Sequence, residues 1–121
     1  MLEFHKKFGM VFNTKPTLVD DKLLELRVKL IDEEATEFRD AAAARDLVGM
    51  ADAIGDLLYV VLGAAVAMGI DSEAVFAEVH RSNMTKLWPD GTVHRREDGK
   101  VLKPPTYSPA DIKGVLEKLS E

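Results

Sequence analysis

The sequence contains no cysteine, which excludes disulfide bonds, zinc–thiolate sites and cysteine nucleophiles. Aromatic residues make up only 7% of the chain, and the amino terminus lacks the apolar stretch of a signal peptide. The longest apolar run, Leu57 to Ile70, falls short of the roughly twenty residues that a membrane-spanning helix needs. We therefore expect a cytoplasmic protein that does not associate with membranes.

Positive charge is scarce relative to negative charge. The chain has 16 Lys and Arg residues against 21 Asp and Glu residues, for a formal net charge of -5. This balance disfavours a nucleic-acid partner, because binding to a phosphate backbone relies on a basic surface. The length of 121 residues and the 46% content of hydrophobic residues predict one globular domain spanning residues 1–121.

The spacing of apolar residues predicts an all-α fold, a bundle of two long antiparallel helices and a third helix, with a short helix at each end. The expected ranges are residues 1–13, a long helix from Asp20 or Asp21 to about Arg45, a second from about Leu47 to Met68, a third capped by Asp71 and ending near Met84, and a last helix capped by Ser108. Gly69 is expected just past the second long helix. That helix is apolar nearly all round, so we expect further copies of the chain to complete the core, in a homodimer or homotetramer.

The segment 90–107 differs in kind from the helical parts. It contains two turn signals, Asp90-Gly91 and Asp98-Gly99, a basic cluster at 94–96 and the rigid pair Pro104-Pro105. These features predict a small hairpin or an ordered flap.

Carboxylates occupy helix positions where the pattern calls for apolar residues. Glu34 and Glu37 continue the apolar stripe in heptad register with Leu23 and Leu30. The full set on the two long helices is Glu33, Glu34, Glu37, Asp52 and Asp56. Buried carboxylates cost several kcal/mol each unless they are compensated, so the set predicts a bound cation. Ligands that are all oxygen atoms suit Mg²⁺ or Mn²⁺.

Two other interpretations compete with a magnesium site. One is a solvated acidic face with basic helix neighbours as partners, namely Arg27, Arg39 and Arg45. The other is a di-iron centre of the ferritin-like type, which requires Glu-x-x-His motifs. None of the three histidines, His5, His80 and His94, follows a glutamate at this spacing on the long helices, so the di-iron interpretation is weak.

The ordered set of motifs resembles a known family. The segment 32–37, DEEATE, looks like the E-E-x-x-E motif of the all-α nucleoside triphosphate pyrophosphohydrolases. Segments 53–60 and 79–86 are similar to the next two helices of that group, and segment 98–112 resembles the tail of its MazG-like, phosphoribosyl-ATP-pyrophosphohydrolase-like branch. The resemblance implies Mg²⁺-dependent hydrolysis of a nucleoside triphosphate to the monophosphate and pyrophosphate, in nucleotide-pool housekeeping.

The resemblance and the chemistry together imply roles for individual residues. The expected metal ligands are Glu34, Glu37, Asp52 and Asp56. Glu33 or Glu34 would orient or deprotonate the attacking water. The expected substrate-binding residues are Asn83, Lys86, Lys100, Lys103 and Tyr107.

One position departs from the family pattern. The second motif is usually E-x-x-D, but the residue three before Asp56 is Ala53, and Asp52 is the only acid able to substitute. Two alternatives therefore stand beside the main hypothesis. One is phosphoribosyl-ATP as the substrate, and the other is a catalytically weakened helical module that binds nucleotides.

Overall fold

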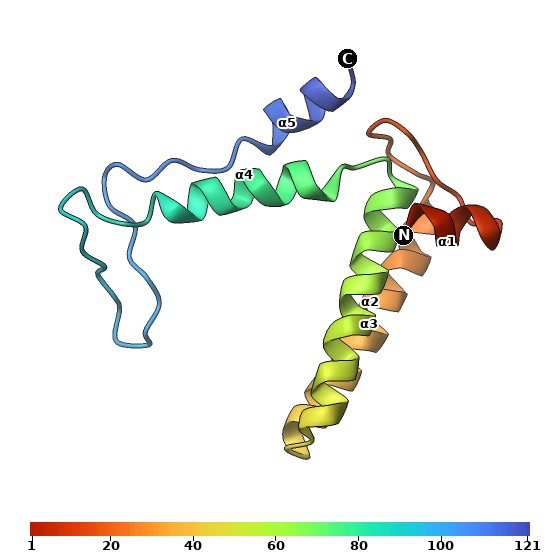
Figure 1. Ribbon diagram of the computed structural model, residues 1–121, viewed down its shortest axis with the longest axis horizontal. Helices are drawn as coiled ribbons and strands as arrows, with labels where there is room; N and C mark the ends of the chain where they lie inside the picture. The colour runs from red at the N-terminus through yellow and green to blue at the C-terminus, as the bar shows by residue number, and fades with distance from the viewer. The chain divides into compact units, whose positions relative to one another are not determined.

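The computed structural model describes residues 1–121 and is all-helical, as the sequence predicts (Figure 1). Its helices are α1 (Leu2–Lys7), α2 (Asp21–Ala43), α3 (Leu47–Ala67), α4 (Ser72–Met84) and α5 (Ile112–Leu119). The chain divides into two compact units, Met1–Ile70 and Asp71–Glu121, which are described separately below. A single domain over residues 1–121 stays a prediction.

Helices α2 and α3 form an antiparallel hairpin that dominates the first unit (Figure 1). Asp20 caps α2 by accepting a hydrogen bond from Leu23 N (2.9 Å), and Asp46 caps α3 by accepting one from Gly49 N (3.0 Å). Close approaches at two glycines fix the register of the hairpin. A Cβ added to Gly49 would lie 3.2 Å from the Ala41 side chain, and one added to Gly63 would lie 2.8 Å from Arg27 Nη1.

The amino-terminal helix is shorter than the predicted range 1–13. Helix α1 ends at Lys7, and Met10 N then donates to His5 O (2.8 Å) as the chain turns through Gly9 at φ 66°. The following segment lies against the end of α3, where Asn13 Nδ2 donates to Ala67 O (2.6 Å). Residues 8–13 therefore do not extend α1. They form hydrogen bonds to carbonyl groups at the end of α3 instead.

Gly69 ends α3, as predicted. Its φ is +68°, in the left-handed region, and a Cβ at this position would collide with the Lys15 carbonyl. Glycine is therefore required here for both backbone conformation and space.

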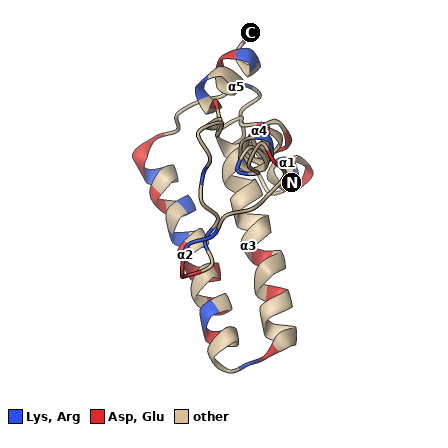
Figure 2. Cartoon of the chain, turned by 90° about the vertical axis from the view of Figure 1, so that its left-hand side faces the viewer, with Lys and Arg blue, Asp and Glu red and all other residues tan.

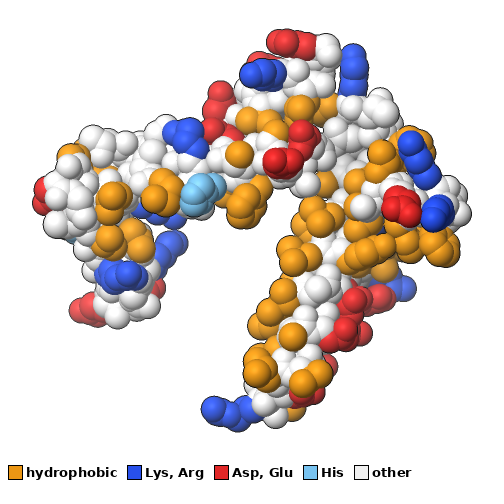
Figure 3. All heavy atoms as spheres, in the orientation of Figure 1, with side chains coloured by type: hydrophobic (Ala, Val, Ile, Leu, Met, Phe, Trp, Pro, Cys, Tyr) orange, Lys and Arg blue, Asp and Glu red, His pale blue; other side chains and the backbone are white.

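The first unit buries few large apolar side chains. The buried apolar residues of α3 are small, namely Ala53, Gly63, Ala64 and Ala67. Hydrophobic side chains follow the α2–α3 hairpin along its surface (Figure 3). Most of the apolar run from Leu57 to Ile70 lies in α3. This 21-residue helix is long and apolar enough to cross a membrane by length and composition alone, and 22% of its most apolar window is buried. Much of the apolar surface of α3 is therefore uncovered in a single chain.

In the second unit, α4 begins as predicted and α5 begins later than predicted. Asp71 caps α4 by accepting from Ala74 N, whereas α5 is capped by Asp111 rather than Ser108. Ser108 is instead held on α4, because Ser82 Oγ donates to its carbonyl (2.7 Å) and its own N–H donates to Thr85 Oγ1 (2.8 Å). Because its backbone N–H and C=O groups are bonded to α4, Ser108 does not act as the N-cap of α5.

Residues 88–102 form an ordered loop, named here the 88–102 loop, rather than a two-stranded hairpin. It contains one antiparallel bridge, between Arg95 and Val101, and a turn through Gly99 at φ 85°. The Trp88 and His94 rings stack with centroids 4.1 Å apart. The prediction that residues 90–107 act as a flap stays a prediction.

Candidate functional site

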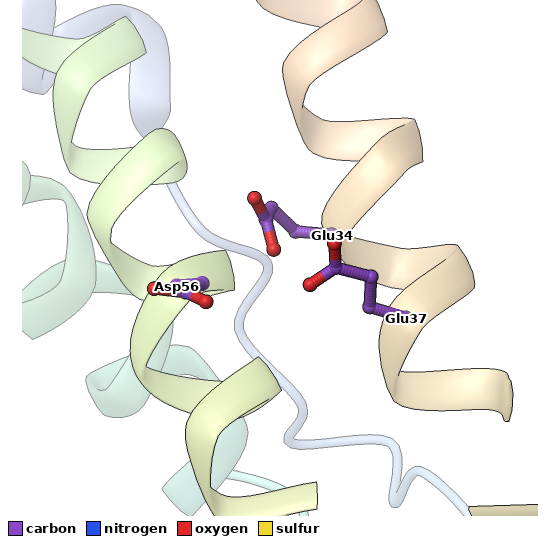
Figure 4. Close-up of side chains that lie close together, drawn as sticks. All are labelled: Glu34, Glu37 and Asp56. Atoms are coloured by element: carbon purple, nitrogen blue, oxygen red, sulfur yellow. The ribbon is translucent and has the colours of Figure 1, made fainter. Parts of the chain in front are cut away.

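Three of the predicted carboxylates meet between α2 and α3. In the antiparallel register of α2 and α3, Arg27 lies opposite Gly63 and Ala41 lies opposite Gly49. The same register places Glu34, midway along α2, opposite Asp56 on α3. Glu34, Glu37 and Asp56 each offer one carboxylate oxygen, and these oxygens lie within 4.8 Å of one another. Glu34 and Glu37 extend from α2 towards α3, which carries Asp56 (Figure 4). These three residues are called the acid cluster below.

Negative charge in the acid cluster is not compensated by the protein. Burial raises the pKa of Glu34, and a hydrogen bond with Glu37 and the charges of Glu37, Asp56 and Glu33 raise it further. Glu34 Oε2 has no exposed surface and no hydrogen-bond partner, and no lysine or arginine forms an ion pair with the cluster. Helix α3 has acidic positions but no Lys or Arg, whereas α2 has both (Figure 2).

The donor set of the acid cluster fits a hard divalent cation. All three groups are carboxylates, two on α2 and one on α3, and the shielded, partnerless oxygen of Glu34 would be stabilised by a positive charge. Three protein ligands leave coordination positions for water and for substrate phosphate, which is how Mg²⁺ is usually bound in phosphoryl-transfer sites.

The other two acids predicted for the site lie outside the acid cluster. Asp52 lies one helical turn before Asp56 and is exposed, as are Glu37 and Asp56 within the cluster, and its role as a ligand stays a prediction. Glu33 is exposed too, but it is near enough for its charge to raise the pKa of Glu34. With Glu37 it lines an open groove of about 860 Å³ along α2.

Ala53, which replaces the family glutamate, faces α2. Ala53 is only 2% exposed. Glu34 and Asp56 lie opposite each other in an antiparallel pair, so the residue three positions before Asp56 lies opposite the residue three positions after Glu34. Ala53 is therefore near Glu37. The methyl group of Ala53 therefore lies at the position from which the carboxylate of a glutamate would reach the acid cluster.

The predicted substrate-binding residues all belong to the second unit and form two groups. Asn83, Lys86 and Lys100 line one groove at the end of α4. Lys103 and Tyr107 form a separate pair, with Lys103 Nζ 4.7 Å from the centre of the Tyr107 ring. A hydrogen bond with Ser82, followed by the charges of nearby lysines, lowers the pKa of Tyr107.

The sequence reasoning missed a buried cation in the first unit. Arg27, expected as a surface partner in one interpretation, is 6% exposed, and its Nε and Nη2 atoms have no hydrogen-bond partner. Burial lowers the pKa of its guanidinium group. His5 is 1% exposed and its Nδ1 lies 2.8 Å from Val11 O. The signal that could have found Arg27 is its heptad spacing from Glu34, which places both on the face of α2 that meets α3.

Comparison with known proteins gives a family match and a viral relative. The model of the family "Phosphoribosyl-ATP pyrophosphohydrolase" matches residues 1–83, which include the acid cluster. The "Uncharacterized protein L479" of Acanthamoeba polyphaga mimivirus is 30% identical over 125 residues, covering 98% of this chain and 47% of the viral protein. The chain thus spans about half the length of this curated relative.

The family match carries the functional conclusion at a coarse level. Members of this family are in general dependent on a divalent metal, and the acid cluster lies within the matched residues. The match supports a pyrophosphohydrolase-type function without fixing the substrate. Because the match covers more than half of the sequence, the chain belongs to the phosphoribosyl-ATP pyrophosphohydrolase family, within the MazG-like all-α pyrophosphohydrolases.

Proposed function

We propose that the protein is a Mg²⁺-dependent nucleoside triphosphate pyrophosphohydrolase, which converts a nucleotide or deoxynucleotide triphosphate to the monophosphate and pyrophosphate. The observation that carries this proposal is the buried, partnerless Glu34 oxygen within three converging carboxylates. Family membership supports the same type of reaction.

The roles of the residues follow from their positions. Glu34, Glu37 and Asp56 would hold the metal ion, which when bound stabilises negative charge on the phosphates and lowers the pKa of a coordinated water. Glu33 lies beside the acid cluster without belonging to it, so its carboxylate is free to orient a water molecule and accept its proton. The water oxygen forms a bond to the α-phosphorus as the bond from that phosphorus to the bridging oxygen breaks, and pyrophosphate leaves.

The direct test is pyrophosphate release by the purified protein with and without Mg²⁺. The substrate panel should contain the common nucleoside triphosphates, their deoxy forms and phosphoribosyl-ATP, because the family name makes the last a second candidate substrate. The double variant Glu34→Gln, Glu37→Gln should lose turnover. A matched control, Glu73→Gln with Glu117→Gln, removes two exposed carboxylates elsewhere and should retain it. Wild-type turnover no faster than that of the first double variant would overturn the proposal.

A non-catalytic nucleotide-binding module is the second candidate, and the buried methyl group of Ala53 favours it. Loss of a metal-site carboxylate lowers metal affinity and activity. The variant Ala53→Glu separates the two candidates. A large gain of activity from an inert parent supports the weakened module, whereas an active parent contradicts it.

We further propose that a second copy of the chain covers α3, in a homodimer or homotetramer. The exposed apolar side chains of α3 include a heptad stripe of Leu47, Ile54, Leu58 and Val61. A bilayer suits this helix less well, because Asp52 and Asp56 lie within it. Light scattering coupled to size-exclusion chromatography should give at least twice the chain mass of 13.4 kDa, and a monomer at micromolar concentration would contradict this proposal.

A further inference from the structure

The first unit buries a cation that has no partner. The Arg27 side chain is 6% exposed, and its Nε and Nη2 atoms have almost no exposed surface and no hydrogen-bond partner. Nε and Nη2 form the edge of a guanidinium group that can bind an oxyanion through two parallel hydrogen bonds. A buried charge without a counterion is costly, so Arg27 would gain from any opening of the structure that lets an anion reach this edge.

Helix α1 packs on α3 and covers the guanidinium group of Arg27 (Figure 1). The point that a Cβ of Gly63 would occupy lies 2.8 Å from Arg27 Nη1 and 3.4 Å from His5 Nε2, so the two side chains meet α3 at one place. His5 is 1% exposed, and its Nδ1 donates to Val11 O (2.8 Å), because a carbonyl oxygen can only accept. The imidazole ring carries no negative charge, so α1 covers Arg27 without compensating its charge.

Helix α1 is itself weakly held. It has six residues and no side-chain cap at its first turn, and a helix of this length is unstable in water without tertiary contacts. Leu2 and Phe8 are exposed, whereas Phe4 packs edge-to-face on Tyr59 of α3, with ring centroids 5.4 Å apart. The contacts that hold α1 in place are therefore limited, and they include the costly burial of Arg27.

The chain after α1 provides a hinge and an anchor. Gly9 has φ 66°, and a Cβ at this position would meet nothing within 4 Å, so the turn is not packed against other residues. Further along, Asn13 N and Thr17 N donate to carbonyl oxygens at the end of α3 (3.2 and 2.8 Å). These bonds involve no charged group and do not depend on α1.

We propose that α1 is a lid that opens about Gly9 and exposes Arg27 as a binding site for an oxyanion, while residues 13–17 stay bound to α3. An oxyanion binds the open form alone and therefore raises its population. A phosphate group and a carboxylate group share the required chemistry, because each offers two oxygen atoms to the guanidinium edge. The lid needs neither the acid cluster nor hydrolysis, so its test is independent of the proposed function.

Hydrogen exchange followed by mass spectrometry tests the lid, by comparing peptides of α1 with peptides that contain residues 13–17. The α1 peptides should exchange faster in the wild type. Gly63→Ala should speed their exchange about tenfold or more, because the added methyl group collides with Arg27 Nη1. Gly55→Ala is the matched control on the same helix, since its methyl group meets nothing within 4 Å, and it should leave α1 exchange unchanged.

Removal of the buried charge should have the opposite effect. Arg27→Met should slow α1 exchange about tenfold, because the closed lid then covers an apolar side chain. Arg39→Met, at an exposed position of the same helix, should leave it unchanged. Circular dichroism confirms that each variant is folded, and the pair of glycine variants tests the lid even if Arg27→Met does not fold.

The oxyanion site is tested by repeating the exchange in phosphate, acetate and chloride salts at equal ionic strength and pH. Phosphate or acetate should speed α1 exchange in the wild type relative to chloride, and neither should do so in Arg27→Met. Equal exchange in the three salts overturns the oxyanion site. One common rate for α1 and residues 13–17, or equal responses to Gly63→Ala and Gly55→Ala, overturns the lid.

Discussion

The acid cluster and the basic groove at the end of α4, which includes Lys86, Arg95 and Lys100, differ in sign of charge and in the structure that supports them. The first places three carboxylates between two long helices without a cation, and the second is a groove whose lining includes three cations and no carboxylate. In both cases like charges are gathered at a cost to stability, and each set is relieved by a ligand of the opposite sign. Both candidate sites therefore share one property, a group of like charges without a partner of opposite charge in the protein.

The supporting structures predict different responses to substitution. The α2–α3 register sets the backbone positions of the acid cluster, so no other acid is placed to take over from a lost member. Groove cations act mainly through charge and flexible stems, so each contributes a smaller and more separable amount. The predictions below test this difference.

The largest effect is expected from Asp56→Asn. Asp56 belongs to the acid cluster and Asp52 does not, so loss of the first should lower kcat/KM about 100-fold or more, and loss of the second by less than about tenfold. Steady-state pyrophosphate release by the two variants gives the comparison. Equal losses would establish Asp52 as the replacement for the glutamate missing at Ala53.

Much of the helical framework follows from local signals in the sequence. Asp20 and Asp71 cap their helices as predicted, and Gly69 ends α3, because each requirement depends only on the neighbouring backbone. Ser108 and Asp111 are both good caps locally, and the choice between them depends on hydrogen bonds to α4 that the local pattern does not contain.

Part of the candidate site was also predictable, because spacing along a single helix is a local signal in the sequence. Heptad spacing brought out Glu34 and Glu37, and the pair of acids one helical turn apart on the next helix, Asp52 and Asp56, brought out Asp56. The burial of Arg27 and the place of Ala53 in the acid-cluster layer depend on the register between α2 and α3, which spacing along one helix does not determine.

Ala53→Glu should destabilise the protein in EDTA by about 2–3 kcal/mol, because it inserts a larger, charged side chain at a buried position beside Glu37. Mg²⁺ should then raise the Tm of the variant more than that of the wild type, since a cation compensates the added carboxylate. Thermal melts with EDTA and with Mg²⁺ measure both effects. An equal Mg²⁺-induced shift in the two proteins would place residue 53 outside the metal site.

Arg27→Met tests whether the buried guanidinium group of Arg27, which lies between α2 and α3 as the acid cluster does, also lacks a partner. Replacing a buried, uncompensated guanidinium by an apolar side chain of similar length should stabilise the protein by about 1–2 kcal/mol in urea unfolding. The matched change Arg39→Met, at an exposed position of the same helix, should have almost no effect. Strong destabilisation by Arg27→Met would instead reveal a counterion supplied by another chain.

The smallest effect is expected in the second unit, where one carboxylate is fully compensated. Glu78 accepts hydrogen bonds from Arg81 and from Asp111 N (2.7 Å), and these lower its pKa to about 2. Because this value lies below the ordinary 4.5, the ionised group stabilises the folded unit above about pH 4.5, and that contribution is lost as the pH falls to about 2.

Glu78→Gln should therefore lower the Tm at pH 7, and the Tm values of variant and wild type should converge as the pH approaches 2. Solvent around this ion pair keeps the effect small. Glu73→Gln, at an exposed position in the first turn of α4, is the control and should show no such convergence. A Tm difference that stays constant from pH 7 to pH 2.5 would assign the contribution of Glu78 to packing, because most of the charge-dependent stabilisation is lost over that range.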